Sequence, residues 1–600
     1  MRVGTDTGGT FTDLVTADGR VAKVLSTPED PGRAVRQALG RAVGDEVPEL
    51  LAHGTTVATN AVLERRGAPV ALVTNEGFAD LIEIARQDRP SLYDQDVDRP
   101  EPLVPRAWRL EVPGRLDATG AEIEPVRAEA LPDVPAEARS VAVCLLHADL
   151  DPAHELAVRA ELERRGVDVT CSHEVSPEFR EYERTATTVI NAYVRPACRT
   201  YLRNLDGVAG DVVVMTSAGG LLPLDRAAEL PVALLLSGPA GGVRAGAAAA
   251  MANGYPDAIT FDMGGTSTDV CLVRDGEPEP AAQRMVGGFP VRLPSLDVVT
   301  IGAGGGSIAR IDAGGALVVG PESAGAVPGP ACYGRGGTNP TVTDANLVAG
   351  HIPADATFPD LGRLDLDAAR AALDGAGVDA DGVLAVVNAN MERALRAVSV
   401  ERGVDPRGLA LVAFGGAGPL HACALADALD LAAVIIPARA GVLSALGILG
   451  SPDQRDLVRS WPTPTDHDGL EHALADLADE AASLLGDDDA SGSDVEVTTA
   501  LDCRYLGQSH ELRVADIASF ADEHLRRNGY ARERAPIEVI ALRATAVRPP
   551  AVDVSSLPVP DRRTGEGPLV IAEEDATVWV PPGWRAEAGA AGALVLRRVS

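Results

Sequence analysis

The chain has 600 residues, 46% of them hydrophobic, and this length predicts roughly two to four domains rather than a single core. No stretch is apolar and long enough to cross a bilayer and no charged-then-apolar leader precedes the first strand, so we expect a cytoplasmic protein without membrane contacts. The formal charge of -34 argues against a nucleic-acid partner, and with Lys23 as the single lysine it predicts the acidic surface typical of a salt-rich cytoplasm.

The first predicted element is a strand that runs into a glycine turn at the N-terminus. Val3 to Thr5 lead into D-T-G-G-T-F-T-D at residues 6–13, and a second strand ends in an Asp18-Gly19 hairpin turn. Glycines let the backbone turn sharply and bring its N–H groups close to an anion, and a phosphate chain suits this arrangement. Asp6, at the strand end, is placed to hold Mg²⁺ through water or to polarise an attacking water.

Strands and helices alternate from here to residue 185. We expect a helix from Pro31 to about residue 43, strands at 70–74 and 141–146, and a long helix opened by residues 178–185, whose alternating charges suit a solvated face.

Two polar stretches in this region are candidate substrate sites. His53 and Thr55 lie in a threonine-rich turn, and a lone histidine there is more often a satisfied turn residue than a ligand-binding one. Arg86 and Arg89 lie in R-Q-D-R-P and are candidate carboxylate clamps, because guanidinium forks match carboxylates. A surface loop of salt bridges explains the same residues equally well.

The N-terminal pattern returns in the middle of the chain as D-M-G-G-T-S-T-D at residues 262–269, between strand-like segments and before an Asp275-Gly276 turn. One copy is weak evidence, because Gly-Gly hairpins are common. Two copies with matching flanks predict two phosphate-binding loops. Asp262 corresponds to Asp6, and the second aspartates of the two copies, Asp13 and Asp269, are further catalytic candidates.

Other glycine-rich turns follow strands in the second half. Residues 237–242 open an alanine-rich helix, and residues 303–307 form an A-G-G-G-S turn. In F-G-G-A-G-P-L-H at 414–421, a backbone with little side-chain cover can lie against adenine or ribose. None of these turns has the lysine of a P-loop, so a P-loop ATPase is excluded.

The C-terminal part is expected to be a small β-rich unit reached through linkers. Polar and proline residues mark linkers at 451–468 and 486–493. Strand-like alternation appears at 495–502 and 537–545, and residues 568–596 are β-rich.

Ten of these stretches together resemble the A subunit of the hydantoinase/5-oxoprolinase family, whose ATPase domains belong with actin, sugar kinases and heat-shock chaperone ATPases. The matching stretches are D-T-G-G-T-F-T-D (6–13), H-G-T-T-V-A-T-N (53–60), R-Q-D-R-P (86–90), P-E-F-R-E-Y-E-R (177–184), S-G-P-A-G-G (237–242), D-M-G-G-T-S-T-D (262–269), A-G-G-G-S-I-A (303–309), P-G-P-A-C-Y-G (328–334), T-D-A-N (343–346) and F-G-G-A-G-P-L-H (414–421). The resemblance implies an α/β fold of two duplicated actin-like (ribonuclease H-like) ATPase lobes with a smaller β-rich C-terminal domain. It divides the chain into an N-terminal lobe (1–185), a central hydantoinase/oxoprolinase domain (186–452) and a C-terminal α+β domain (453–600).

The same resemblance implies an ATP-dependent reaction. In such enzymes ATP phosphorylates the carbonyl oxygen of a cyclic amide, such as 5-oxoproline or a hydantoin, and water then opens the ring. Two alternatives are a subunit of an acetone- or acetophenone-type carboxylase and a nucleotide switch whose ATP cycle moves a partner. ATP and Mg²⁺ are the expected cofactors, with K⁺ as a further candidate ion. A B-type subunit is the expected partner, in a homo- or hetero-oligomer.

Site residues carry over from the family motifs position by position. The residues expected around the phosphates are Thr7, Gly8, Gly9, Thr10, Gly264, Gly265, Thr266, Gly304 and Gly305. Adenosine is expected beside Gly415, Gly416 and Gly418. Asp6 and Asp262 are expected to serve Mg²⁺ and the reacting water or oxygen.

Overall fold

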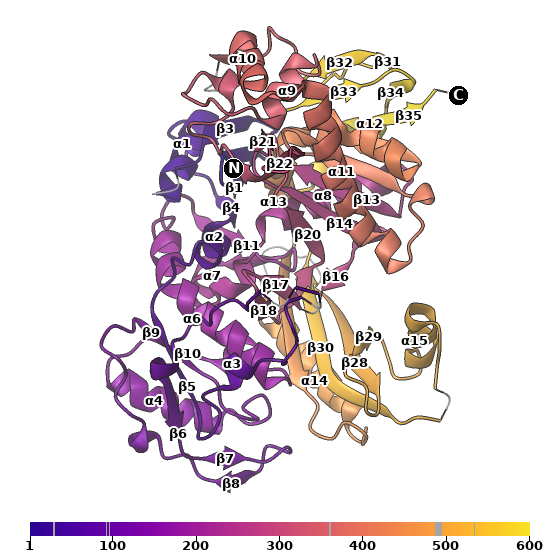
Figure 1. Cartoon of the computed structure of the whole chain (residues 1–600). Helices are drawn as coiled ribbons and strands as arrows, with labels where there is room; N and C mark the ends of the chain where they lie inside the picture. Colours follow the sequence, from indigo (N-terminus) through magenta and orange to yellow (C-terminus); the bar gives the residue numbers. More distant parts are fainter. Residues whose placement is uncertain are drawn as a thin grey trace.

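The computed structural model describes residues 1–27, 30–91, 93–94, 96–281, 283–358, 362–486, 495–532 and 534–599. The fold is a mixed α/β arrangement of two large sheets, one smaller sheet and the helices that cover them (Figure 1). The predicted fold class is therefore confirmed at this level. Within the described residues, no helix has both the length and the apolar character needed to cross a membrane.

The first large sheet joins the N-terminal strands to strands from the C-terminal part of the chain. Its order is β29 (Leu512–Val514), β28 (Glu496–Tyr505), β30 (Ile537–Arg548), β27 (Asp453–Ser460), β12 (Leu221–Pro223), β11 (Asp211–Met215), β4 (Leu50–Thr55), β1 (Arg2–Thr7), β2 (Phe11–Thr16) and β3 (Val21–Leu25).

The second large sheet also takes in C-terminal strands. Its order is β15 (Glu277–Pro278), β14 (Thr268–Arg274), β13 (Ala258–Met263), β25 (Ala410–Phe414), β26 (Ala433–Ile436), β35 (Leu594–Arg598), β34 (Trp584–Ala588) and β31 (Gly565–Glu566), and β20 (Val298–Ile301) pairs with β14.

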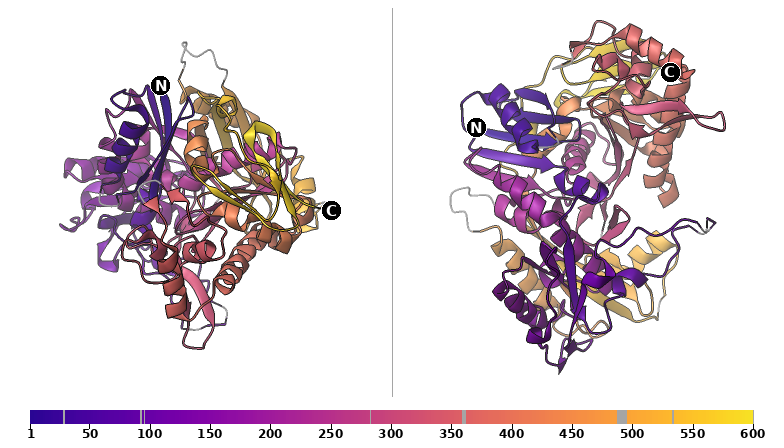
Figure 2. Two further views of the ribbon diagram at one scale, coloured as in Figure 1. Left: turned by 90° about the horizontal axis from the view of Figure 1, so that it is seen from above. Right: turned by 60° about the vertical axis from the view of Figure 1, so that its left-hand side comes forward.

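Residues 453–600 therefore do not form one separate sheet, because their strands extend both large sheets. The right-hand view of Figure 2 shows the pale orange strands at the bottom beside the dark purple part and the yellow strands at the top. The predicted domain boundary at residue 453 is therefore not a boundary between two sheets. The linker predicted at 451–468 is wrong where the chain forms β27. Most of the linker predicted at 486–493 lies outside the described residues.

A smaller sheet of four parallel strands lies at the lower left of Figure 1, below β1 and β4 of the first sheet. Its order is β10 (Val169–Cys171), β9 (Ser140–Val143), β5 (Val70–Asn75) and β6 (Arg109–Val112), and the helices α4 (Ala153–Arg164) and α6 (Glu181–Arg203) pack against it. The predicted long helix is α6, and the helix predicted from Pro31 is α1 (Pro31–Val43).

The two copies of the glycine motif form the same local structure. In each copy an antiparallel hairpin, β1–β2 or β13–β14, pairs on its other side with a parallel strand, β4 or β25. The turns match as well, because the N–H of Gly8 donates to Phe11 O at 3.0 Å and that of Gly264 to Ser267 O at 3.1 Å. These matches support a duplication, and the actin-like character of the two lobes remains a prediction.

The Asp-Gly turns that follow the two hairpins differ from each other. In the second, Asp275 and Gly276 both have positive φ, as expected for a two-residue hairpin turn. In the first, only Gly19 has positive φ.

Two helices lie between the large sheets and connect them. α8 (Gly238–Ala252) packs against β13 and β25, and α13 (Leu443–Leu449) packs against β1, β2 and β4. The helices also pack on each other at glycines, since a Cβ atom on Gly447 would lie 1.9 Å from the carbonyl oxygen of Gly241. The contact therefore requires glycine at position 447.

Replacing Gly447 by alanine is expected to destabilise the protein by about 1–3 kcal/mol, because the two helices must move apart. The control is Gly375→Ala in α10 (Leu366–Ala376), where an added Cβ meets nothing within 4 Å, so it should be neutral or slightly stabilising. Urea unfolding of both variants measures the difference. Equal midpoints for the two variants would contradict the proposed role of the helix contact.

Candidate functional site

Strand pairing places two rows of residues in equivalent positions on the two large sheets. In the first sheet, Gly54, Asp6, Asp13 and Lys23 lie opposite one another across β4, β1, β2 and β3. In the second sheet the corresponding row is Phe414, Asp262, Asp269 and Thr300. The rows share their two central aspartates and differ at the end, where one has a lysine and the other a threonine.

The two glycine loops meet between the sheets. A Cβ atom on Gly265 would lie 3.1 Å from Thr10 Oγ1, so the tip of the second loop touches the first. The aspartates interact too, because the charge of Asp262 raises the pKa of Asp6. The structure thus brings the four candidate aspartates of the two motifs into one site.

Burial and mutual repulsion raise the pKa values of these carboxylates. Burial, followed by the charges of Asp13 and Asp262, raises the pKa of Asp6 to about 8. Burial and Asp269 raise the pKa of Asp262 to about 7, although the Ser444 hydroxyl donates to Asp262 Oδ2 at 3.3 Å. Burial raises the pKa of Asp269 to about 6.

Asp13 differs from the other three because it has a cation beside it. Lys23 Nζ lies 2.8 Å from Asp13 Oδ1 and 3.1 Å from the carbonyl oxygen of Gly441. Burial raises the pKa of Asp13, and Lys23 opposes that rise. Asp6 has no such partner, since its buried Oδ1 accepts no hydrogen bond within the described part of the chain.

This donor set fits Mg²⁺. Magnesium prefers carboxylate oxygens and water, and here several carboxylates face a single ammonium group. Asp13 is paired with Lys23, so the oxygens left for a metal belong to Asp6 and Asp262, with Asp269 beside them. The unpaired Oδ1 of Asp6 is the observation that points to a bound cation.

In the metal-free protein, the ionisation of Asp6 is expected to lower the free energy of unfolding as the pH rises from about 4 to about 8. The folded protein keeps a proton on Asp6 up to about pH 8, whereas the unfolded chain releases it near 3.8, so the folded state binds more protons in this window. Asp6→Asn should therefore unfold at a higher temperature than the wild type at pH 8 in EDTA, and the difference should shrink toward pH 5. A difference that grows toward pH 5 would contradict this assignment, and Mg²⁺ should stabilise only the wild type.

The residues of the two predicted phosphate loops differ in their exposure. Gly9 and Thr266 are exposed at the loop tips, and Gly8, Gly264 and Gly265 are half-buried. Thr10 is buried against the second loop, and the buried Oγ1 of Thr7 has no hydrogen-bond partner within the described residues.

Gly304 and Gly305 support a phosphate loop instead of offering their own N–H groups. The N–H of Gly305 donates to Gly264 O at 3.0 Å, and the N–H of Gly304 donates to Ser307 Oγ at 2.9 Å. Both glycines are buried. In this structure both N–H groups are used to hold the second loop in place, and contact of these glycines with phosphate remains a prediction.

The glycines expected near adenosine lie beside Asp262. A Cβ atom on Gly415 would lie 2.3 Å from Asp262 Oδ1, and this residue has a positive φ of 76°. Gly416 is exposed, and Gly418 begins α12 (Gly418–Leu429). This bare backbone lies beside Asp262, and adenosine binding here remains a prediction.

The structure does not support His53 and Thr55 as substrate ligands. His53 is fully buried, and its two ring nitrogens contact Thr5 Oγ1 at 2.7 Å and the Tyr201 hydroxyl at 2.6 Å. Burial lowers its pKa to about 3, so the ring is neutral. Thr55 is buried as well, and its hydroxyl accepts from the N–H of Val57. Both residues stabilise the end of β4.

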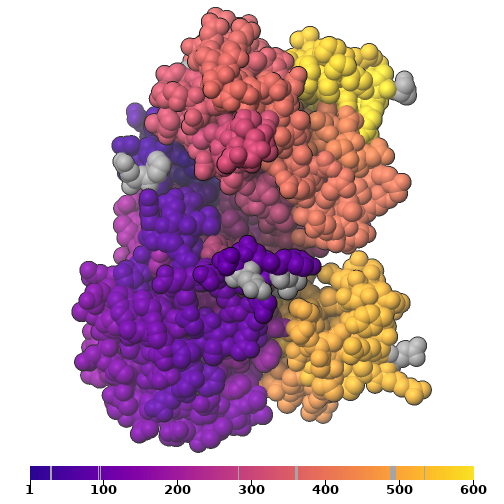
Figure 3. All heavy atoms as spheres, viewed as in Figure 1, coloured from indigo at the N-terminus to yellow at the C-terminus, as the bar shows by residue number. Residues whose placement is uncertain are grey.

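Arg86 and Arg89 lie in different surroundings and do not form a shared carboxylate clamp in this structure. Arg86 forms a two-point ion pair with Glu183 of α6, at 2.8 and 2.5 Å, so its guanidinium already has a carboxylate partner. Arg89 is exposed. Arg86 lines a cavity of about 420 Å³ between α6 and residues 283–290. In Figure 3 the dark purple segment around residue 90 crosses the face between the upper and lower halves.

Two residues of the site were not predicted from the sequence. Lys23 could have been found, because it is the only lysine and lies on the strand that follows the motif. Ser444 gave no signal, since it lies in an apolar helix far along the chain and reaches Asp262 only through the packing of α13.

Comparison with protein families gives two matches that cover most of the chain. The family described as hydantoinase/oxoprolinase matches residues 184–452. The N-terminal region of the same family matches residues 2–166.

Three relatives are similar over most of this chain. The caprolactamase subunit alpha of Pseudomonas jessenii is 34% identical, with 97% of each chain covered. 5-oxoprolinase 1 of Arabidopsis thaliana is 34% identical over 75% of this chain and 41% of its own length. The acetophenone carboxylase gamma subunit of Aromatoleum aromaticum is 34% identical over 74% of this chain and 66% of its own length.

The fold is also that of a solved relative. The crystal structure of the ATP-dependent caprolactamase from Pseudomonas jessenii matches over 100% of both chains, with a TM-score of 0.85 and 31% identity.

Proposed function

Because the chain belongs to the hydantoinase/oxoprolinase family, we propose that it is the ATP-hydrolysing subunit that activates the carbonyl group of a cyclic amide for ring opening. The observation that carries the proposal is the pair of glycine loops meeting over Asp6 and Asp262. Such a site suits the triphosphate of a nucleotide with its divalent cation.

The reaction that we propose has two stages. First, the bond between the γ-phosphorus and ADP breaks, and a new bond forms between that phosphorus and the carbonyl oxygen of the lactam. Water then adds to the carbonyl carbon, the ring C–N bond breaks, and the nitrogen takes a proton. A second water releases phosphate, so one lactam, one ATP and two waters give an amino acid, ADP and phosphate.

Different residues of the site have different roles in this reaction. The exposed tips of the loops, Gly9 and Thr266, are placed to contact phosphate oxygens. Asp6 and Asp262 would hold Mg²⁺, which supplies positive charge to the transferring phosphoryl group. The open side of the site by Gly416 leaves room for adenosine.

A partner subunit and the location of the protein also belong to the proposal. Two relatives are named as subunits, one of a caprolactamase and one of an acetophenone carboxylase. Because a subunit works with other chains, we infer that this chain has a B-type partner subunit. We also propose Mg²⁺ as the metal, with K⁺ as a further ion, and a cytoplasmic location.

A ketone carboxylase is the second candidate, because one relative is named as a carboxylase subunit. ADP release separates the candidates when it is measured in high KCl with Mg²⁺, with and without the partner subunit. A lactam or hydantoin that accelerates ADP release supports the first proposal. Acceleration only by acetone or acetophenone together with bicarbonate overturns it in favour of the second. Acceleration only by a protein partner would indicate a nucleotide switch.

A further inference from the structure

Arg284 is a partly buried cation that has no acidic partner among the described residues. Its Nη2 donates to Ser217 Oγ and to the carbonyl oxygen of Leu235, and its buried Nε has no acceptor. Loss of water around the guanidinium lowers the pKa of Arg284 to about 10.

Three other buried arginines of this chain are paired with acids. Arg184 contacts Asp149, Arg543 contacts Asp502, and Arg562 contacts Glu573. Acidic residues outnumber basic ones by 87 to 53, so Arg284 lacks a carboxylate partner in a chain that is rich in carboxylates. A buried charge without a counter-charge is unfavourable, and a bound anion would remove that cost.

Arg284, in the strand β17 (Arg284–Val286), contacts the first sheet through Ser217, at the same edge of that sheet as Asp6. Ser217 follows the carboxyl end of β11, and β11 and β1 are the two parallel neighbours of β4. The segment from Leu235 to Gly238 leads from Arg284 to the metal site, since a Cβ on Gly238 would lie 3.4 Å from Asp6 Oδ1. The chain from Leu235, which contacts Arg284, to Gly238, beside Asp6, spans at most about 11 Å. A small ring and a phosphoryl group together can bridge this distance.

A second arginine and a backbone donor lie on the same turn. Arg244 of α8 lies against Gly219, its buried Nε has no acceptor, and burial lowers its pKa. The N–H of Ala218, between Ser217 and Gly219, donates to none of the described residues. The turn that follows β11 therefore has two guanidinium groups beside it, and Arg244 Nη2 donates to Gln454 Oε1 at 3.3 Å.

We propose that Arg284 binds a carboxylate on the substrate, so that this chain acts on a lactam that carries an anionic group in preference to a neutral lactam. The inference rests on the proposed function and adds the substrate class to it. The ring carbonyl would lie toward Asp6 and Asp262, and the carboxylate would lie toward the turn after β11. Arginine suits this role, because hydrogen bonds to a carboxylate are stronger than those to a neutral oxygen.

Two lactams with the same ring test this assignment. 5-oxoproline carries a carboxylate and 2-pyrrolidinone does not, and calorimetry with Mg²⁺ and a non-hydrolysable ATP analogue measures the binding of both to the full chain. We expect 5-oxoproline to bind about 10- to 100-fold more tightly. Equal binding of the two lactams, or no binding of 5-oxoproline, would overturn the inference even if no variant folded.

Three variants separate a role in binding from a structural one. Arg284→Met should weaken 5-oxoproline binding by about 10- to 100-fold and leave 2-pyrrolidinone unchanged, and Arg284→Lys should restore part of the difference. The control, Arg562→Met, breaks an ion pair with Glu573 and should lower the unfolding midpoint without changing the preference between lactams. Equal weakening of both lactams by Arg284→Met would contradict the inference.

ADP release decides the proposed function independently of these binding data. If 5-oxoproline binds through Arg284 but neither lactam accelerates ADP release, ring activation is wrong and the carboxylate site stands. If 2-pyrrolidinone accelerates ADP release as well as 5-oxoproline does, ring activation stands and the carboxylate preference is wrong.

Discussion

Asp262→Asn is expected to lower the rate of ATP hydrolysis by about 10³-fold or more, equivalent to about 4 kcal/mol of transition-state stabilisation. Asparagine keeps the shape and the hydrogen bond from Ser444 but removes the charge that a metal needs. The fold should persist, because burial and then repulsion from Asp269 already disfavour a charge at this position. Steady-state ADP release by the two proteins measures the effect.

Asp405→Asn is the matched control for this experiment. Asp405 is an aspartate on the surface that pairs with Arg407, and its replacement should leave ADP release unchanged. Circular dichroism of both variants checks the fold. If Asp262→Asn hydrolyses ATP at the wild-type rate, the metal site is wrongly assigned.

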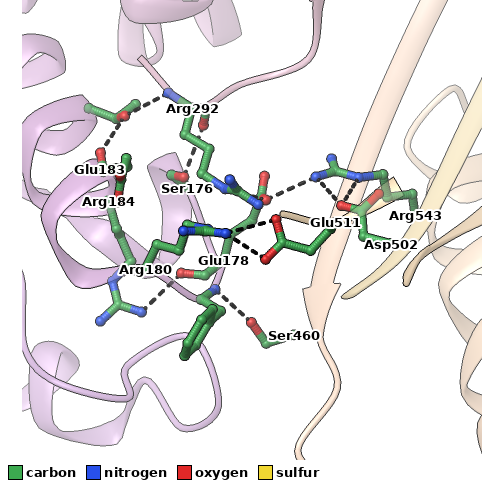
Figure 4. A network of polar contacts seen from close by, with 12 residues as sticks. Ser176, Glu178, Arg180, Glu183, Arg184, Arg292, Ser460, Asp502, Glu511 and Arg543 are labelled. Atoms are coloured by element: carbon green, nitrogen blue, oxygen red, sulfur yellow. Dashed lines mark hydrogen bonds and ion pairs between the residues drawn. The ribbon is translucent and has the colours of Figure 1, made fainter. Parts of the chain in front are cut away.

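Glu178→Ala is expected to destabilise the protein by about 3–5 kcal/mol, because it removes the acid that pairs with buried Arg292 and one of the two acids that buried Arg543 contacts. Glu178 Oε2 accepts from Arg292 Nε at 2.8 Å and from Arg543 Nη2 at 2.9 Å, and only 2% of its side chain is exposed. Arg543 also contacts Asp502 at 2.7 Å. Figure 4 shows how this cluster joins the start of α6 to strands β28 and β30.

Urea unfolding measures the effect of this substitution, and Glu566→Ala is its control. Glu566 pairs with Arg585 on the surface, where the loss of an ion pair costs about 0–1 kcal/mol. We expect a clear fall in the urea midpoint for Glu178→Ala and almost none for the control. Equal midpoints would show that the buried cluster does not hold the C-terminal strands in place.

The hairpins of the site could be predicted from the sequence because they depend on local signals. Glycine turns, flanking strand residues and Asp-Gly pairs lie within about twenty residues of each other in both copies, and the structure contains both hairpins. Local signals also placed α1 and α6. The register of those hairpins then fixes which aspartates lie opposite one another.

Features that depend on distant parts of the chain could not be predicted in this way. The charges at residues 178–185 suit a solvated helix face, yet Glu178, Glu183 and Arg184 are buried, because the C-terminal strands and Asp149 lie against them. β27 contains several charged residues and resembles a linker, although it pairs along its whole length with β30. His53 is buried because Tyr201, 148 residues later, covers it.

The stoichiometry of ADP and ring-opened product tests the central claim most directly. The measurement uses the chain with its partner subunit, Mg²⁺ and a lactam that accelerates ADP release, and it counts both products over the same interval. We predict one ADP for each ring opened, and neither product when ATP or the lactam is omitted. Ring opening without ATP, or ADP release at the same rate without the lactam, would contradict ATP-driven activation of the carbonyl group.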